Sequence, residues 1–272
     1  RRWFTPGRDL IEGMLLSDDI GLEDSYSISL CQSKFDMGGN AKMGIVFGSD
    51  LYSPVSKASA LAMSGMEIIV NLAAASEIVG SRARREKLIR EQSDVLHCVY
   101  AYCSAGMMES TQDGVFSGHS VIAENGVILA ENEDLTDSGY LMVMDCDLGK
   151  VRALRNRSDV FKDCAANAYE QMEKWITQLD VENLRSDGTL YHLNKLPFIP
   201  ETKAERDAYC REVFQIQVSG LKRRLKAINC NPVLGISGGL DSTLALLVAV
   251  EAMRQLGRPT TDVYGVTMPC FG

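Results

Sequence analysis

Residues 233–243 read VLGISGGLDST. An apolar run enters two glycines and continues into a second apolar run at 244–256, which is the pattern of a strand, a tight turn and a helix. Two glycines let a ligand approach the backbone closely, and consecutive N–H groups at a helix N-terminus favour a phosphate. Asp241 would repel that phosphate unless a divalent cation bridges the two groups. The stretch therefore predicts a phosphate-binding loop between a strand and a helix, with Mg²⁺ implied if a nucleotide binds there.

The predicted nucleotide-binding residues follow the strand without a break. They are Gly235, Ile236, Ser237, Gly238, Gly239, Leu240, Asp241 and Ser242, and Asp241 is also the predicted metal ligand. The spacing matches neither the P-loop pattern, because no Gly-Lys-Ser/Thr follows, nor the dinucleotide pattern of three spaced glycines. The alternative is a loop whose Asp241 or Ser242 caps the following helix without any ligand.

Upstream of this loop, hydrophobic periodicity predicts a strand, a helix and a strand in succession. The Asn125-Gly126 pair supplies the positive φ angles of a hairpin turn between two further strands. The first half of the segment 81–102 is rich in basic and acidic residues. This pattern predicts a half-buried helix whose charged face is solvated, rather than a ligand site. The predicted elements are strands at 44–47, 67–72 and 140–145, helices at 55–63 and 81–102, a hairpin over 118–130, and a helix at 211–228 whose inward residues are Val213, Ile216, Val218, Leu221 and Leu225.

Length and composition set the class of protein. A chain of 272 residues predicts about two domains, and 46% hydrophobic with 24% charged residues excludes a disordered or collagen-like protein. The net charge of −8 argues against a nucleic-acid scaffold. No segment has the roughly 20 uninterrupted apolar residues of a membrane span. The predicted organisation is a first domain over 1–150, a linker region over 151–200 and a second domain over 201–272.

The eight cysteines have no Cys-x-x-Cys pair and no regular spacing. They predict reduced core thiols, in preference to disulfides or zinc ligands. The chain also starts without Met and stops soon after a predicted strand at 263–269. We expect it to be a piece of a longer protein.

The segment Ser-Gly-Gly-Leu-Asp-Ser at 237–242 resembles the signature of the PP-loop ATP pyrophosphatases. Its flanks at 214–221, 265–269 and 271–272 look like glutamine-dependent NAD synthetases in particular. Farther upstream, segments 2–7, 106–110 and 116–126 resemble the nitrilase-type glutaminase domain of the same family. The resemblance runs over nearly the whole chain.

This resemblance implies an α/β fold in two parts. The first is the C-terminal part of a nitrilase-like α-β-β-α sandwich, and the second is the start of a Rossmann-like PP-loop parallel sheet. It implies a ligase that uses ATP and Mg²⁺ to amidate nicotinic acid adenine dinucleotide, with nitrogen from glutamine or ammonia. We expect a cytoplasmic homo-oligomer without nucleic-acid or membrane partners.

The glutaminase half departs from the family pattern in three places. The family's nucleophilic Cys has Gly48 in its place, and no other catalytic residue of that site is identified; Ser49, one position later, is the alternative nucleophile. The family's Asn-Leu-Ser-Ala-Ser stretch, which helps to hold glutamine, reads Asn-Leu-Ala-Ala-Ala at 71–75, so its hydroxyls are missing at Ala73 and Ala75. Gly80 remains, but the basic residue after it is Ser81. The triad's Glu and Lys would lie before residue 1. Because the nucleophilic Cys is missing at Gly48, ammonia is the expected nitrogen donor.

Two other readings remain open. One is a catalytically silent scaffold or regulatory paralogue, which the losses at Gly48, Ala75 and Ser81 favour and the intact Ser237–Thr243 loop opposes. The other is a different PP-loop amidating ligase, such as a relative of GMP or asparagine synthetase. The nitrilase-like half argues against that reading, because those enzymes pair the loop with other glutaminases.

Overall fold

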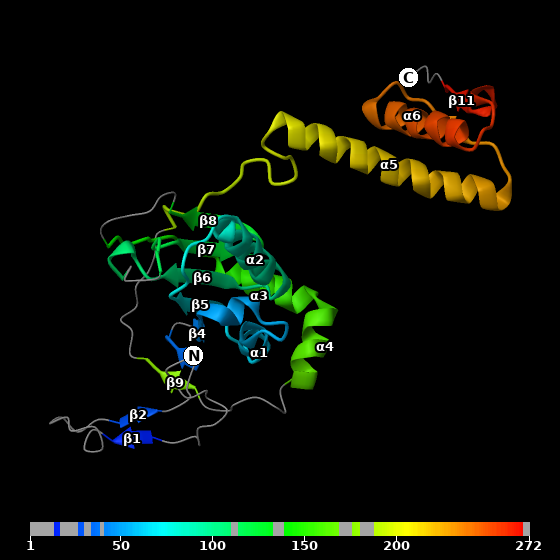
Figure 1. Ribbon diagram of the computed structural model, residues 1–272. Helices are drawn as coiled ribbons and strands as arrows, with labels where there is room; N and C mark the ends of the chain where they lie inside the picture. The colour runs from blue at the N-terminus through cyan, green and yellow to red at the C-terminus, as the bar shows by residue number, and fades with distance from the viewer. Residues whose placement is uncertain are drawn as a thin grey trace. The chain divides into compact units, whose positions relative to one another are not determined.

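The computed structural model describes residues 14–16, 27–29, 34–38, 41–109, 114–132, 139–168, 176–179 and 188–268. The segments 2–7 and 271–272, on which part of the family resemblance rests, lie outside the described residues. The chain divides into two compact units, Arg1–His192 and Leu193–Gly272. Both are mixed α/β, which confirms the predicted fold class (Figure 1).

The first unit is built on a seven-stranded sheet with the strand order β8-β7-β6-β5-β4-β3-β9. Strands β4, β5 and β6 are parallel to one another. Strand β3 runs antiparallel to β4 and parallel to β9, whereas β7 runs antiparallel to both β6 and β8. The strands are β3 (Lys34–Asp36), β4 (Lys42–Phe47), β5 (Ile68–Ala73), β6 (Val99–Ser104), β7 (Ser120–Glu124), β8 (Val127–Glu131) and β9 (Thr177–Gln178). A separate antiparallel pair joins β1 (Met14–Leu16) to β2 (Ser27–Ser29).

Two helices connect the parallel strands and cover one face of the sheet. Helix α1 (Lys57–Met63) lies between β4 and β5, and α2 (Ser81–Val95) lies between β5 and β6 (Figure 1). Between sheet and helices lies a core that includes Val46, Ile69 and Tyr100 from the strands and Leu61 and Ile89 from the helices. The opposite face of the sheet is also apolar, and there the exposed fractions of Phe47 and Leu72 reach 59% and 44%.

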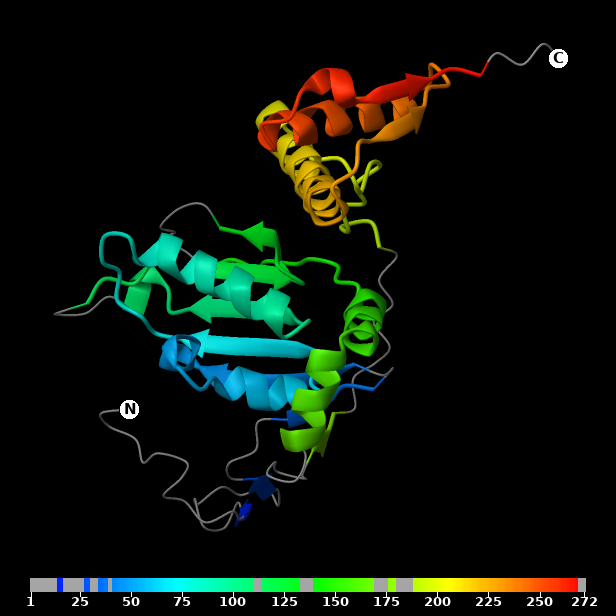
Figure 2. The ribbon, with the colours of Figure 1, turned by 90° about the vertical axis from the view of Figure 1, so that its right-hand side faces the viewer.

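A further pair of helices, α3 (Leu148–Arg157) and α4 (Asp159–Ala168), lies at the end of the sheet where β5 begins (Figure 2). Two arginines of α3 attach it there. The buried Arg155 donates hydrogen bonds to the carbonyls of Met66, Leu96 and His97 at 2.8–3.2 Å. Arg152 pairs with the buried Glu67. Residues 151–168, which were expected to belong to the linker region, therefore pack on the first unit. The predicted domain boundaries remain a prediction.

The chain from 81 to 104 corrects one prediction. Helix α2 ends at Val95, and 99–104 is strand β6 rather than the last turns of a helix. His97, with a φ of +42°, breaks the helix, and the β-branched and aromatic residues after it suit a strand. Val95, the last residue of α2, is 70% exposed and so lies outside the buried face of the helix.

The hairpin prediction is confirmed, whereas the strand at 140–145 is wrong. Asn125 and Gly126 adopt φ angles of +46° and +84° between β7 and β8. Residues 140–145 are irregular and belong to no sheet. Their apolar side chains Leu141 and Val143 are 87% and 60% exposed, so no packing partner holds them in a ladder.

The second unit places two helices beside a short parallel sheet. Helix α5 (Lys203–Ile228) begins at a Thr202–Glu205 capping box, and α6 (Leu240–Gln255) connects β10 (Val233–Gly235) to β11 (Tyr264–Val266). Val218 and Leu225 pack with Met253 in its core, as predicted. Ile216 is 65% exposed, so its predicted inward position is wrong. No helix in the described ranges is both long and apolar enough to cross a membrane.

Candidate functional site

The predicted nucleotide loop lies directly after β10, at the carboxyl edge of the parallel pair β10–β11. Ile236 still donates its N–H to the carbonyl of Val266 at 2.8 Å, and the chain then turns through Gly238 at a φ of +83°. Helix α6 starts at Leu240, two residues later. Ligands of open α/β sheets bind at this edge of the strands.

Hydroxyl groups gather at the mouth of the loop. The hydroxyls of Ser237 and Ser242 lie 3.2 Å apart, and those of Ser242 and Thr243 donate to the Gly239 carbonyl at 3.0 and 2.9 Å. A Cβ atom at Gly238 would meet nothing within 4 Å, so the space in front of the turn is open. The predicted residues Gly235 to Ser242 therefore form one continuous surface at a helix N-terminus, which fits an anionic ligand.

Asp241 lies in the first turn of α6 and is exposed. Across the described residues, no three His, Cys, Asp or Glu side chains gather in a way that could hold a metal ion. An Mg²⁺ ion at this loop would therefore be shared between Asp241 and the phosphates of a bound nucleotide, which is a usual arrangement for this ion.

The second predicted site lies in the first unit, where β4 and β5 end at the same edge of the sheet. Gly48 opens the short helix η3 (Gly48–Tyr52) with a φ of +36°. A Cβ atom there would have only the Cα of Ala73 within 4 Å, at 3.9 Å. A side chain would therefore have room at position 48, but Gly48 offers no atom that could attack a substrate.

The residues after β5 form a loop, 74–80, that leads into α2. The carbonyl of Ala73 accepts the N–H of Ala105, and the N–H of Glu77 bonds to the carbonyl of Val115 at 2.7 Å. The Ser81 hydroxyl donates to the Glu77 carboxylate at 2.5 Å and also accepts the Ile78 N–H. Ser81 thus closes the loop instead of presenting a positive charge at its surface.

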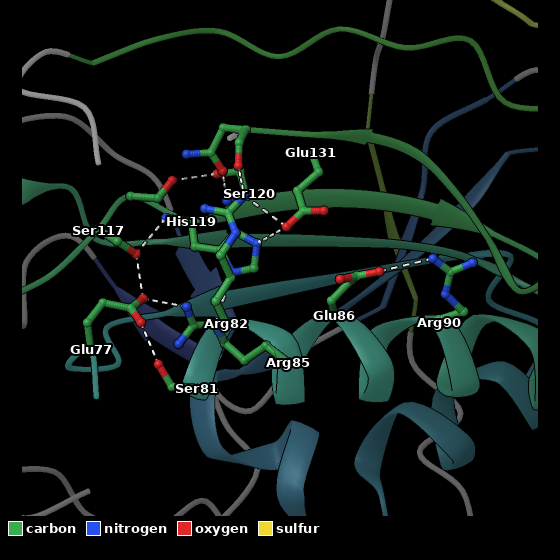
Figure 3. A network of polar contacts seen from close by, with 12 residues as sticks. Glu77, Ser81, Arg82, Arg85, Glu86, Arg90, Ser117, His119, Ser120 and Glu131 are labelled. Carbon is green, nitrogen blue, oxygen red and sulfur yellow. Dashed lines mark hydrogen bonds and ion pairs between the residues drawn. The ribbon is translucent and has the colours of Figure 1, made fainter. Parts of the chain in front are cut away.

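A buried polar network continues from this loop, as Figure 3 shows. Arg85 donates one hydrogen bond to the Glu77 carboxylate and another, from Nε, to Nδ1 of His119 at 3.0 Å. Since Nδ1 accepts, Nε2 of His119 carries the ring proton, and it donates to Glu131 at 2.8 Å. Arg82 pairs with the same carboxylate of Glu131 at 2.9 Å.

Burial and hydrogen bonds shift the ionisation of this network. Burial alone would raise the pKa of Glu77, but donation from Ser117, Ser81 and Arg85 outweighs it and holds the pKa below its usual value. Burial lowers the pKa of His119, although its bond to Glu131 opposes the shift. Glu77 is therefore held ionised and His119 neutral at pH 7.

The sequence did not identify this network. The charges of 81–102 were predicted to be solvated, but Arg85 is only 1% exposed. One signal was available: Arg85 lies four residues before the buried Ile89, on the same face of the helix. His119, the partner of Arg85, is fully buried.

Two of the described cysteines, Cys98 and Cys146, are poorly suited to replace the missing nucleophile. The six described cysteines are free thiols. Burial raises the pKa of Cys98 to about 12 and that of Cys146 to about 11. The prediction of core packing is wrong for Cys103, Cys164 and Cys210, which are exposed; Cys31 and Cys270 lie outside the described residues.

Comparison with known proteins identifies the relatives of this chain. No protein-family model matches it. The glutamine-dependent NAD(+) synthetase of Mycobacterium leprae is 34% identical over 229 residues, which make up 82% of this chain and 33% of that protein. The protein of the same name from Mycobacterium tuberculosis strain H37Rv is 34% identical over 255 residues, 92% of this chain and 37% of that protein.

A solved structure is also similar, that of a glutamine-dependent NAD+ synthetase from Acinetobacter baumannii in complex with ADP. It is 20% identical, with a TM-score of 0.39, and the match covers 88% of this chain and 35% of that one. The chain spans about a third of the length of the curated relatives that it matches. Over most of its own length, the chain is homologous to the glutamine-dependent NAD(+) synthetases.

Proposed function

We propose that this chain is part of an ATP-dependent ligase that amidates nicotinic acid adenine dinucleotide to NAD(+). The observation that carries the proposal is the Ser237–Ser242 loop at the carboxyl end of β10, in a chain 34% identical to proteins named for NAD(+) synthesis. All seven matching relatives, which are 24–34% identical to this chain, have that name, and this favours NAD synthesis over the other amidating ligases.

The loop has a defined part in the proposed reaction. Its backbone N–H groups and the hydroxyls of Ser237, Ser242 and Thr243 bind the ATP phosphates at the N-terminus of α6. Mg²⁺, when bound, neutralises phosphate charge. Asp241 holds this ion at the mouth of the loop, and the two glycines allow the close approach of the phosphates.

We further propose that ammonia, rather than glutamine, supplies the nitrogen. Glutamine hydrolysis in this family requires a side-chain nucleophile, and Gly48 stands where the family has its Cys. The hydroxyls that would hold glutamine are missing at Ala73 and Ala75, and Ser81 is bound to Glu77. An enzyme without its nucleophile retains only the contribution of substrate binding and the oxyanion hole, orders of magnitude below the intact site.

An assay of the full-length protein with each nitrogen source tests both proposals. We expect NAD(+) formation with ammonium and hardly any with glutamine. Gly48→Cys should recover little glutamine-dependent activity, because Ala75 and Ser81 would still leave glutamine misplaced, and an error of about 1 Å can cost a hundredfold in rate. Ser49→Ala is the matched control. Rapid glutamine-dependent synthesis that this variant loses would show that Ser49 is the nucleophile.

The silent-scaffold alternative is favoured by the same losses at Gly48, Ala75 and Ser81. It predicts no NAD(+) formation from either nitrogen source and no binding of ATP with Mg²⁺. Calorimetry with ATP on the full-length protein separates it from the ligase, because a scaffold has no use for the open loop at Gly238.

We further propose that the protein lies in the cytoplasm as a homo-oligomer, without nucleic-acid or membrane partners.

A further inference from the structure

Three donors from two separate segments converge on the carboxylate of Glu77. Ser81 and Arg85 come from the first two turns of α2, and Ser117 comes from the segment before β7. The hydroxyls of Ser81 and Ser117 each lie 2.5 Å from a Glu77 oxygen, and Arg85 donates to the same oxygen as Ser117 (Figure 3). Such a set, one guanidinium and two hydroxyls, is a usual way to bind a carboxylate.

The donors are held in place by contacts that do not involve Glu77. Arg85 is fixed from its other side by His119, which is fully buried and itself bonded to Glu131. The Ser117 oxygen accepts the backbone N–H of His119 at 3.2 Å. Ser81 accepts the N–H of Ile78. Because neighbouring groups orient each donor, the binding geometry does not depend on the carboxylate that fills it.

Because the donors are buried, the folded protein would lose stability if no carboxylate were bound to them. Arg85 is 1% exposed and Ser117 is 5% exposed, whereas the Glu77 side chain is 20% exposed. A guanidinium out of water requires a negative partner nearby. Glu77 supplies that charge from a loop whose next two residues, Ile78 and Val79, are exposed. The carboxylate thus enters the cluster from the solvent side, as a ligand would.

We propose that Ser81, Arg85 and Ser117 form a binding site for a small carboxylate, and that Glu77 occupies this site from within the chain. The ligand class is an organic monocarboxylate of the size of formate or acetate. In the native protein, Glu77 competes with such a ligand at the high effective concentration of an intramolecular group. Removal of its carboxylate opens the site. The proposal is independent of the nitrogen donor and of NAD(+) synthesis.

Thermal unfolding of the full-length protein tests this site by chemical rescue. Glu77→Ala should lower the Tm by several degrees, and roughly 100 mM sodium formate should restore a large part of the loss, while sodium chloride at the same ionic strength should not. The native protein should respond equally to the two salts. If Glu77→Ala does not fold in chloride, the folded fraction is measured by circular dichroism as formate replaces chloride.

Two further variants make the test specific. Glu77→Gln fills the same volume with a neutral amide, so formate should not raise its Tm more than chloride does. The double variant Glu77→Ala/Ser117→Ala lacks one donor and should need a severalfold higher formate concentration for the same rescue. The proposal is overturned if formate and chloride act alike on Glu77→Ala, or if Glu77→Gln gains as much from formate as Glu77→Ala does.

Discussion

The two predicted sites occupy the same kind of place, the carboxyl edge of parallel strands, but their surroundings differ. After β5, the loop 74–80 is fastened by Ser81 and Glu77 to the buried Arg85. After β10, the loop turns through Gly238 with exposed residues and open space in front of it. The first edge is filled by the chain's own side chains, whereas the second is open to a ligand.

This difference indicates that strand topology determines where a site can form, whereas local side chains determine whether that site can bind a ligand. At the edge beside Gly48, the residues after β5 are alanines at 73–75, and the charge of Arg85 is paired with Glu77 inside the protein. At Ser237–Ser242, the hydroxyls contact one another and the backbone N–H and carbonyl of Gly239. Changes at the first edge should therefore affect stability, and changes at the second should affect ligand binding.

The largest expected effect is the replacement of Arg85. Arg85→Met leaves Glu77 and His119 without their buried partner, and the loss of one member of a buried ion pair costs about 3–5 kcal/mol. Urea unfolding of the full-length protein measures it. Arg90→Met, on the same helix, removes an exposed pair with Glu86 and should cost about 0.5 kcal/mol or less. Equal losses in the two variants would contradict the buried network.

The second prediction concerns Asp241. Asp241→Ala should weaken the binding of ATP with Mg²⁺ by about tenfold or more, because the phosphate charge loses its bridge to the protein. Its Tm should stay unchanged, since the side chain is exposed. Asp262→Ala, a carboxylate removed elsewhere in the second unit, serves as the control. Calorimetry that finds unchanged ATP affinity in Asp241→Ala would reject the assignment of the loop.

The third prediction compares two glycines with positive φ. Gly48→Ala and Gly238→Ala each place a Cβ in open space at φ angles of +36° and +83°, so both should cost about 1–2 kcal/mol of backbone strain. Only Gly238→Ala should also weaken ATP binding, because its Cβ enters the space that the phosphates need. ATP affinity that falls in both variants, or in neither, would remove the distinction between the two edges.

The smallest expected effect is the dependence of stability on pH. The pKa of His119 is below its usual 6.5 in the folded protein, so its contribution is present above 6.5 and is lost as pH falls through the lowered value. The pKa of Glu77 is below 4.5, so its contribution is lost only at more acidic pH. In His119→Asn, the loss that begins below 6.5 should disappear while the loss below 4.5 remains. Urea midpoints measured against pH distinguish the two.

The nucleotide loop could be predicted from sequence because its determinants are local. Strand, glycines and helix follow one another within 11 residues, and the hairpin at Asn125-Gly126 is equally local. The network of Arg85 could not be predicted in this way. Its partners Glu77, Ser117 and His119 lie up to 34 residues from Arg85, and only the folded sheet brings them together.

Helix propensity likewise misled the prediction at 99–102. The charged helix α2 continues without a glycine or proline into Val99-Tyr100-Ala101-Tyr102. Pairing with β5 on one side and β7 on the other decides that these residues form a strand. Those partners are distant in sequence, so tertiary context overrides the local pattern.

The attachment of α3 has a consequence for the order in which the first unit folds. The contacts of Arg155 with Met66 and of Arg152 with Glu67 join residues 89 and 85 positions apart. Closing such long stretches of chain is slow, whereas the units β4–α1–β5 and β5–α2–β6 close over much shorter ones. We therefore expect strands β4, β5 and β6 to form first and α3 to dock afterwards. Contacts that form after the transition state slow unfolding without speeding folding, so this pair of arginines acts on the lifetime of the native state.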